Sequence, residues 1–82
     1  MLLDSLKIGA QLEDMIQTEG WEYIENWIKG REKVVTSALK SRPFTDIAEV
    51  RELQAELKAY AILISEVKHR IEQARKAREK LN

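Results

Sequence analysis

The reactive side chains of this sequence do not combine into a recognisable catalytic set. There is one histidine and no cysteine among the 82 residues. His69 falls opposite the apolar seam of a predicted helix, so we expect it to be exposed and inert. The aspartates and glutamates occupy surface positions of predicted helices, where contact with solvent explains them. The three glycines are isolated and none follows a strand, so no phosphate-binding loop is expected. We therefore predict that the protein is not an enzyme.

A bound metal ion or cofactor is not expected either. The absence of cysteine excludes disulfides and thiolate metal sites. A single histidine also excludes the multi-histidine sites that usually hold transition metals. We therefore predict no metal site and no cofactor.

Charge is unevenly distributed along a chain that is formally neutral overall. Residues 68–82 hold six basic and two acidic residues, a net of +4, and residues 1–30 hold six acidic and two basic, a net of −4. A basic helix neutralises phosphates, so one interpretation is a nucleic-acid-associated or regulatory protein. The residues that would serve it are Arg70, Arg75, Lys76 and Arg78.

A second interpretation of the basic end ranks above nucleic-acid binding. The segment contains no aromatic residue to stack on bases, and its Glu72 and Glu79 have helical spacing to neighbouring bases. We therefore favour a solvated end, or one that pairs with the acidic N-terminal third of another copy.

The element that must position these groups is a predicted helix over residues 46–80. It has no internal glycine or proline, and its apolar residues recur at the a and d spacing of a coiled coil. At about 1.5 Å per residue it spans roughly 50 Å. The residues of the seam are Val50, Leu53, Leu57, Tyr60, Ile64, Val67, Ile71 and Ala74.

Two more helices are predicted before it. A short helix over residues 2–17 is interrupted by Gly9, which costs about 1 kcal/mol relative to alanine; a leader that orders only on a partner is the alternative. Thr18 is a good N-cap for a helix over residues 19–41. Gly30 marks either a kink in that helix or a close approach of another backbone. Its buried stripe is predicted to comprise Ile24, Trp27, Ile28, Val34, Val35, Ala38 and Leu39.

The connection around Pro43 predicts how these helices are arranged. About five residues between two amphipathic helices indicate an antiparallel helical hairpin. We therefore expect an all-α fold in a single domain, residues 1–82, with one long coiled-coil-like C-terminal helix and a short N-terminal helix. In the hairpin register Trp21 lies level with Ile64, so residues 66–81, here called the C-terminal arm, receive no partner from the second helix.

Uncovered apolar surface predicts self-association. The C-terminal arm continues the seam without a cover, and the helix is apolar nearly all round from Tyr60 to Ile64. Such a girdle requires burial on more than one side, by the N-terminal helix or by a second subunit. A domain of this size without disulfides or metals is also commonly reinforced by oligomerisation. We therefore expect a homo-oligomer.

The aromatic residues at the start of the second helix add a candidate contact. We expect Trp27 in the core, so at least one of Trp21 and Tyr23 is partly exposed, either as a binding hot spot or as a lid over the N-terminal helix. The residues predicted to contact a second copy or another protein are Trp21, Tyr23, Tyr60, Ile62, Leu63, Val67, Ile71 and Ala74.

Hydropathy bears on location. No segment approaches the roughly 18 apolar residues that a membrane-spanning helix needs. The first residues lack the basic region and apolar core of a signal peptide. We therefore expect no membrane association and a cytoplasmic protein.

Two short motifs resemble those of a class of small viral proteins. They are Thr18-Glu19-Gly20-Trp21-Glu22-Tyr23-Ile24 and, after the breaker, Leu53-Gln54-Ala55-Glu56-Leu57-Lys58-Ala59. Over about residues 18–65 the chain resembles short helical proteins of unassigned function from phage and prophage structural gene clusters. The resemblance implies a virion or assembly component, located in the virion if phage-encoded, and no chemistry.

The function expected from these observations is a non-enzymatic structural or interaction role. The first interpretation is a phage-type virion or assembly adaptor that acts through helical self-association, with another phage protein as a further partner. The alternatives are the nucleic-acid-associated or regulatory protein described above, and an inhibitor that docks an amphipathic face into another protein's groove.

Overall fold

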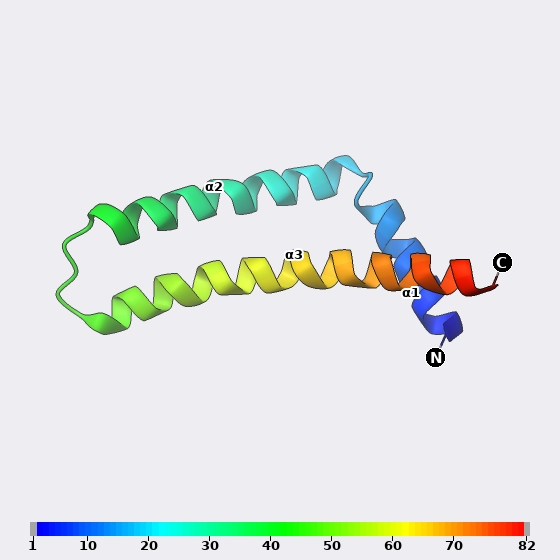
Figure 1. Ribbon diagram of the computed structural model, residues 1–82. Helices are drawn as coiled ribbons and strands as arrows, with labels where there is room; N and C mark the ends of the chain where they lie inside the picture. The colour runs from blue at the N-terminus through cyan, green and yellow to red at the C-terminus, as the bar shows by residue number, and fades with distance from the viewer. Residues whose placement is uncertain (1, 82) are drawn as a thin grey trace.

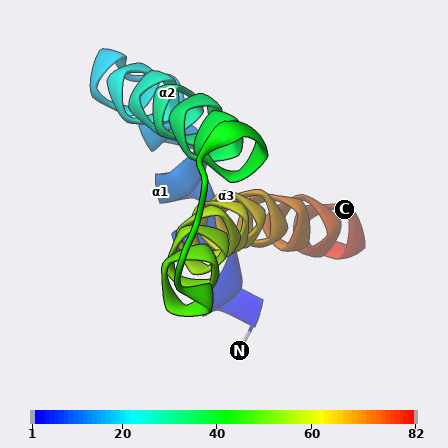
Figure 2. The same ribbon diagram turned by 90° about the vertical axis from the view of Figure 1, so that its left-hand side faces the viewer.

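The computed structural model describes residues 2–81, which form three α-helices in the predicted all-α arrangement (Figure 1). Helix α1 spans Leu2–Met15, α2 spans Glu19–Ser41 and α3 spans Ile47–Leu81. Helices α2 and α3 form an antiparallel hairpin, and α1 crosses the C-terminal half of α3 (Figures 1 and 2). The molecule is elongated, with principal extents of 57 × 26 × 15 Å. None of the helices in residues 2–81 is both long and apolar enough to cross a membrane.

One threonine makes the sharp junction between α1 and α2. The Thr18 hydroxyl donates a hydrogen bond to the Met15 carbonyl at the end of α1, at 2.7 Å. The same oxygen accepts a hydrogen bond from the Trp21 amide at the start of α2, at 3.1 Å. Thr18 has extended backbone angles, so it is the N-cap that the sequence predicts. Because its hydroxyl serves both helix ends, the chain turns without a longer loop.

The hairpin loop is fixed in the same local way. Helix α2 ends at Ser41, and Arg42 is its C-cap. The Arg42 amide donates to the Ala38 carbonyl at 2.9 Å, and its guanidinium lies 5.6 Å from the Phe44 ring centroid. Pro43 follows and disfavours further helix. Helix α3 begins where an Asp46 carboxylate oxygen accepts from the Ala48 amide at 2.9 Å. The connection is therefore short, as the sequence indicates.

The closest packing in the molecule is between α1 and α3. Gly9 is buried against Ala74, and a Cβ built on Gly9 would collide with the Ala74 side chain and lie 3.0 Å from the Arg70 carbonyl oxygen. Ala74 is only 1% exposed, and Val67 and Ala77 are also buried. Small residues on both helices let the two backbones approach each other. Gly9, which weakens α1 as an isolated helix, is therefore what allows α1 to pack on α3.

This packing corrects the prediction that the C-terminal arm is uncovered. Helix α2 reaches only the start of this arm, where Trp21 and Glu25 line a common hollow with Val67 and Ile71. Helix α1 packs on the later turns of the arm, in the place assigned to a second subunit. Val67 and Ala74, two of the predicted contact residues, are therefore buried within the chain and present little surface to a partner. The seam also shifts here, because Ala77 is buried while Arg78, the next a/d position, is exposed. The shift follows from the direction of α1, which crosses the arm obliquely (Figure 1). A helix running alongside the arm would cover the a/d face, whereas α1 covers a neighbouring face.

The contact between α2 and α3 is less tightly packed than the contact between α1 and α3. Trp21, Ile28 and Val35 recur every seven residues and are the buried residues of α2. Opposite them, Leu57 and Ile64 of α3 stay half-buried. The hairpin therefore holds together along one narrow stripe, and much of α2 remains open.

A glycine substitution tests the α1–α3 contact. Gly9→Ala improves helix propensity by about 1 kcal/mol, yet the added methyl group has no room beside Ala74. Overpacking usually costs about 1–3 kcal/mol, so after the gain in propensity we expect a net destabilisation of up to about 2 kcal/mol, measured by urea unfolding. Gly20→Ala is the matched control, because its Cβ meets only the Thr18 hydroxyl at 3.9 Å. A Gly9→Ala variant as stable as the Gly20→Ala control would contradict the close packing.

Candidate functional site

A hydrogen-bonded trio ties the middle of α2 to α3. Arg31 donates from Nε and Nη2 to the two carboxylate oxygens of Glu56, at 2.9 and 2.8 Å. The Tyr60 hydroxyl, one turn further along α3, donates to Glu56 Oε2 at 2.7 Å. This bidentate geometry is directional, so the trio fixes the register in which α2 lies on α3.

The trio also perturbs the titration of its members. The hydrogen bond from Arg31, and secondarily that from Tyr60, holds the pKa of Glu56 below its ordinary value. The pKa of Tyr60 is raised, chiefly because its hydroxyl donates to the Glu56 carboxylate. The pKa of Arg31 is raised by its hydrogen bond to the same group.

The aromatic residues of α2 are placed differently from the sequence prediction. Trp21 is 8% exposed and belongs to the seam, whereas Trp27, which was assigned to the core, is 51% exposed. Trp27 instead meets Tyr60 edge-on, with ring centroids 6.0 Å apart. The seam repeats every seven residues through Ile28, and this rotates the neighbouring Trp27 to the flank. Trp21 therefore does not offer an exposed contact, and the assignment of Trp27 to the core is wrong.

Trp21 lies where all three helices meet. A hollow of about 130 Å³ at this junction is lined by Trp21 and Glu25 of α2, Ile16 just after α1, and Ile64 and Val67 among the α3 residues. The position of Trp21 next to Ile16 and level with Ile64 agrees with the alternative that one aromatic residue closes over the N-terminal helix.

The open side of α2 carries a second, exposed series of residues. Tyr23 is 72% exposed and Val34 is 58% exposed, and Trp27 lies between them. Their spacing of four, three and four residues, counted through Gly30, places them on one helical face. We call this face the outer stripe; it comprises Gly20, Tyr23, Trp27, Gly30, Val34 and Ser37, all exposed.

Helix α3 extends the apolar surface beside Trp27. Tyr60 is half-buried against Trp27, and Leu63, one turn further along the same side of α3, is exposed. Exposed aromatic and aliphatic side chains that gather next to a core are typical of protein contact surfaces. The predicted contact residues Tyr23, Tyr60 and Leu63 are thus brought to one side of the hairpin.

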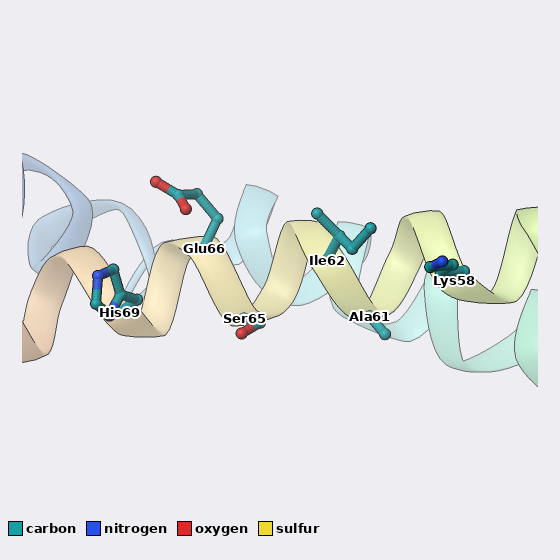
Figure 3. Close-up of a pocket in the computed structure, with 6 residues that line it drawn as sticks. All are labelled: Lys58, Ala61, Ile62, Ser65, Glu66 and His69. Atoms are coloured by element: carbon teal, nitrogen blue, oxygen red, sulfur yellow. The ribbon is translucent and has the colours of Figure 1, made fainter.

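Ile62 lies elsewhere. Figure 3 shows it in a shallow depression whose six lining residues all belong to α3, among them Lys58, Ser65 and His69. All six are exposed and no second helix forms a wall, so the depression does not enclose a ligand. The predicted girdle from Tyr60 to Ile64 is therefore not buried on both sides, because α1 packs further along α3 and leaves Ile62 and Leu63 open.

Most of the predicted basic contact residues already have partners within the chain. Arg70 pairs with Glu66 at 2.6 Å and Arg75 with Glu72 at 2.7 Å. The hydrogen bond to Glu72 also raises the pKa of Arg75. Arg78 reaches Glu13 of α1 at 2.9 Å. The acidic N-terminal segment and the basic C-terminal segment thus meet inside one molecule, whereas the sequence suggested a contact between two copies. Lys76 is exposed, and Ile71 is half-buried near the three-helix junction.

Sequence reasoning missed several residues that matter here. The sequence pattern predicts one buried stripe that includes Trp27 and Val34, and Gly30 is interpreted as a kink or a close approach of another backbone. In the structure Trp27, Gly30 and Val34 lie with Tyr23 on a second, exposed stripe. Two overlapping seven-residue repeats on α2 are the signal that separates them. From the sequence, Glu56 is assigned to solvent with the other acidic residues, and no pair with Arg31 is predicted. The opposite charges of these two residues at facing levels of the hairpin are the signal that could have found the pair.

Comparison of the chain with models of known protein families, with curated proteins and with solved structures finds no match. Within residues 2–81, no three His, Asp or Glu side chains gather in a way that suits a metal ion.

The trio predicts a pH dependence of stability. Glu56 has a lowered pKa in the folded state, so its contribution is present above its ordinary pKa of about 4.5 and is lost as the pH falls through the folded value. Tyr60 has a raised pKa, so its contribution is present below about pH 10 and is lost as the pH rises through the folded value. We expect Glu56→Gln to flatten the acid limb and Tyr60→Phe the alkaline limb of the urea midpoint against pH.

The control for this experiment is Glu66→Gln, which removes an exposed ion pair within α3 and leaves the trio intact. It should preserve both limbs of the profile at the same chain concentration. A Glu56→Gln profile that superimposes on the unmodified protein below pH 5 would contradict the role of the trio.

Proposed function

We propose that this protein is a non-enzymatic interaction module that acts by docking the open side of its helical hairpin onto another helical surface, and that it self-associates through this side. The observation that carries the proposal is the outer stripe, in which Tyr23, Trp27 and Val34 remain exposed beside Leu63 of α3. Exposed aromatic residues with few internal contacts are the residues that dominate protein interfaces.

The organisation of the molecule supports a docking role over a catalytic or nucleic-acid role. The outer stripe is apolar and aromatic, whereas Arg70, Arg75 and Arg78 are held by carboxylates of the same chain. Releasing those arginines to contact phosphates would break existing ion pairs. A nucleic-acid complex that weakens steeply with salt and is lost when these arginines and Lys76 are neutralised would favour the alternative function.

The biological setting of the proposal is assembly of a phage-type particle. It rests on the resemblance of residues 18–65 to small proteins of phage structural gene clusters, and it places the protein in the cytoplasm of an infected cell or in a virion. An elongated hairpin with an adhesive side suits an adaptor between larger components.

Truncation of exposed side chains tests the proposal. In the double variant Tyr23→Ala, Val34→Ala, we expect self-association to weaken about tenfold or more, since hot-spot truncations cost about 1–2 kcal/mol each. Sedimentation equilibrium from low to high micromolar concentration provides the measurement. Monomer stability should hardly change, because both side chains are more than half exposed.

Ile62→Ala is the matched control for this truncation. Ile62 is 60% exposed but lies on the outer surface of α3, away from the outer stripe. It should leave association unchanged. If the unmodified chain sediments as a monomer at high micromolar concentration, the self-association part of the proposal is wrong.

A further inference from the structure

The chain exposes more surface than a compact protein of its mass. A folded monomer of 9.5 kDa exposes about 5,000 Å², whereas this chain exposes 6518 Å². Its radius of gyration of 17.2 Å also exceeds the roughly 12 Å of a compact domain of this length. The excess of about 1,500 Å² is distributed over the whole elongated molecule, and it is larger than the roughly 800 Å² that each partner contributes to a standard interface.

The outer stripe has a pattern of its own that the single chain does not use. Its six residues alternate in steps of three and four, the spacing of a coiled-coil seam. Gly30 interrupts the middle of α2, where glycine is unfavourable, and yet nothing in the chain lies within 4 Å of its absent Cβ. Gly9 is explained by the close approach of α3, but Gly30 has no such neighbour within its own chain.

Read in opposite directions, the outer stripe is complementary to itself. An axis level with Ile28 and Lys29 sets Gly20 opposite Ser37, Tyr23 opposite Val34, and Trp27 opposite Gly30. The largest side chain then meets the position with no side chain. In a parallel pair, by contrast, Trp27 would meet Trp27 and Gly30 would face Gly30, which leaves a clash beside a void.

The charges of α2 also favour an antiparallel pair, because the first half of the helix is acidic and the second half is basic. Residues 19–28 hold three acidic and no basic residues, a net of −3, and residues 29–41 hold four basic and one acidic, a net of +3. The net of the basic half is +2 when Arg31, which is paired with Glu56 in the same chain, is set aside. An antiparallel pair lays each acidic half on a basic half, and brings Glu19 within about one turn of the partner's Lys40 level. A parallel pair would oppose like charges, which is unfavourable.

We infer that the partner of the outer stripe is a second copy of this chain, docked antiparallel along α2 about a twofold axis with Trp27 over Gly30 of the other copy. The inference rests on the proposed function and specifies its geometry. An isologous pair of this kind is closed, since each copy uses the same stripe. It leaves α1 and the C-terminal arm outside the interface.

Engineered cysteines test the direction of docking. The chain has no cysteine, so Gly20→Cys and Ser37→Cys introduce unique thiols at two exposed positions. In the antiparallel pair each thiol faces the other variant, whereas two copies of the same variant hold their thiols about 25 Å apart, far beyond disulfide reach. We expect disulfide-linked dimers from an oxidised mixture of the two variants and none from either alone.

The other possible results of this experiment distinguish failure of the antiparallel geometry from failure of the proposed function. Cross-linking of Ser37→Cys with itself would indicate a parallel pair and overturn the inference. A dimer in sedimentation that fails to cross-link in any combination would show that another face is used; this would overturn the inference and the proposed docking side, and only self-association itself would stand. A monomer in sedimentation would overturn both.

A second variant tests the close approach at Gly30. Gly30→Leu has open space within the chain and a better helix former, so the monomer should fold at least as well. In the dimer it fills the place of Trp27, and we expect the dissociation constant to rise about tenfold or more. Thr36→Leu, exposed on α2 outside the outer stripe, is the matched control and should leave association unchanged. A Gly30→Leu chain that associates as tightly as the unmodified chain would overturn the inference.

Discussion

The contact between Gly9 of α1 and Ala74 of α3 is the constraint on which the rest of the molecule depends. A helix as long as α3 extends past the end of α2, and its last turns need a cover. Helix α1 supplies that cover only because residues without bulky side chains let the two backbones come together. The price is a glycine in the middle of a short helix, which α1 tolerates because packing on α3 supplies the stability that propensity lacks.

The hairpin is organised by a different kind of interaction. Hydrophobic contacts between α2 and α3 are confined to a narrow seam, and directional hydrogen bonds among Arg31, Glu56 and Tyr60 fix how the two helices are aligned. The seam covers only the face of α2 that carries Trp21, Ile28 and Val35. The outer stripe lies on another face of the helix and therefore stays exposed. The thinness of the core and the presence of an exposed aromatic surface are therefore two consequences of the same arrangement.

The distribution of charge has two separate consequences. Between the chain ends it acts within one molecule, since Glu13 and Arg78 join the acidic α1 to the basic end of α3. Along α2 the acidic and basic halves do not face each other within the chain, because they lie on one straight helix. Folding therefore satisfies the first asymmetry. Along α2, Arg31 is held by Glu56, and the lysines of the basic half stay exposed at the surface.

The sequence by itself determined the helices, their ends and the hairpin. Periodicity, the Thr18 cap and Pro43 act over a few residues, so the predicted helix limits differ from those observed by two residues or fewer. Tertiary structure decided which surfaces are used. Whether Trp21 or Trp27 enters the core depends on which face of α2 is turned toward α3. Turning the helix about its axis by about 100°, the angle between successive residues, would exchange the two. Whether Ala74 is exposed depends on where α1 crosses, and that crossing is set by contacts between Gly9 and a residue 65 positions away, which no local pattern encodes.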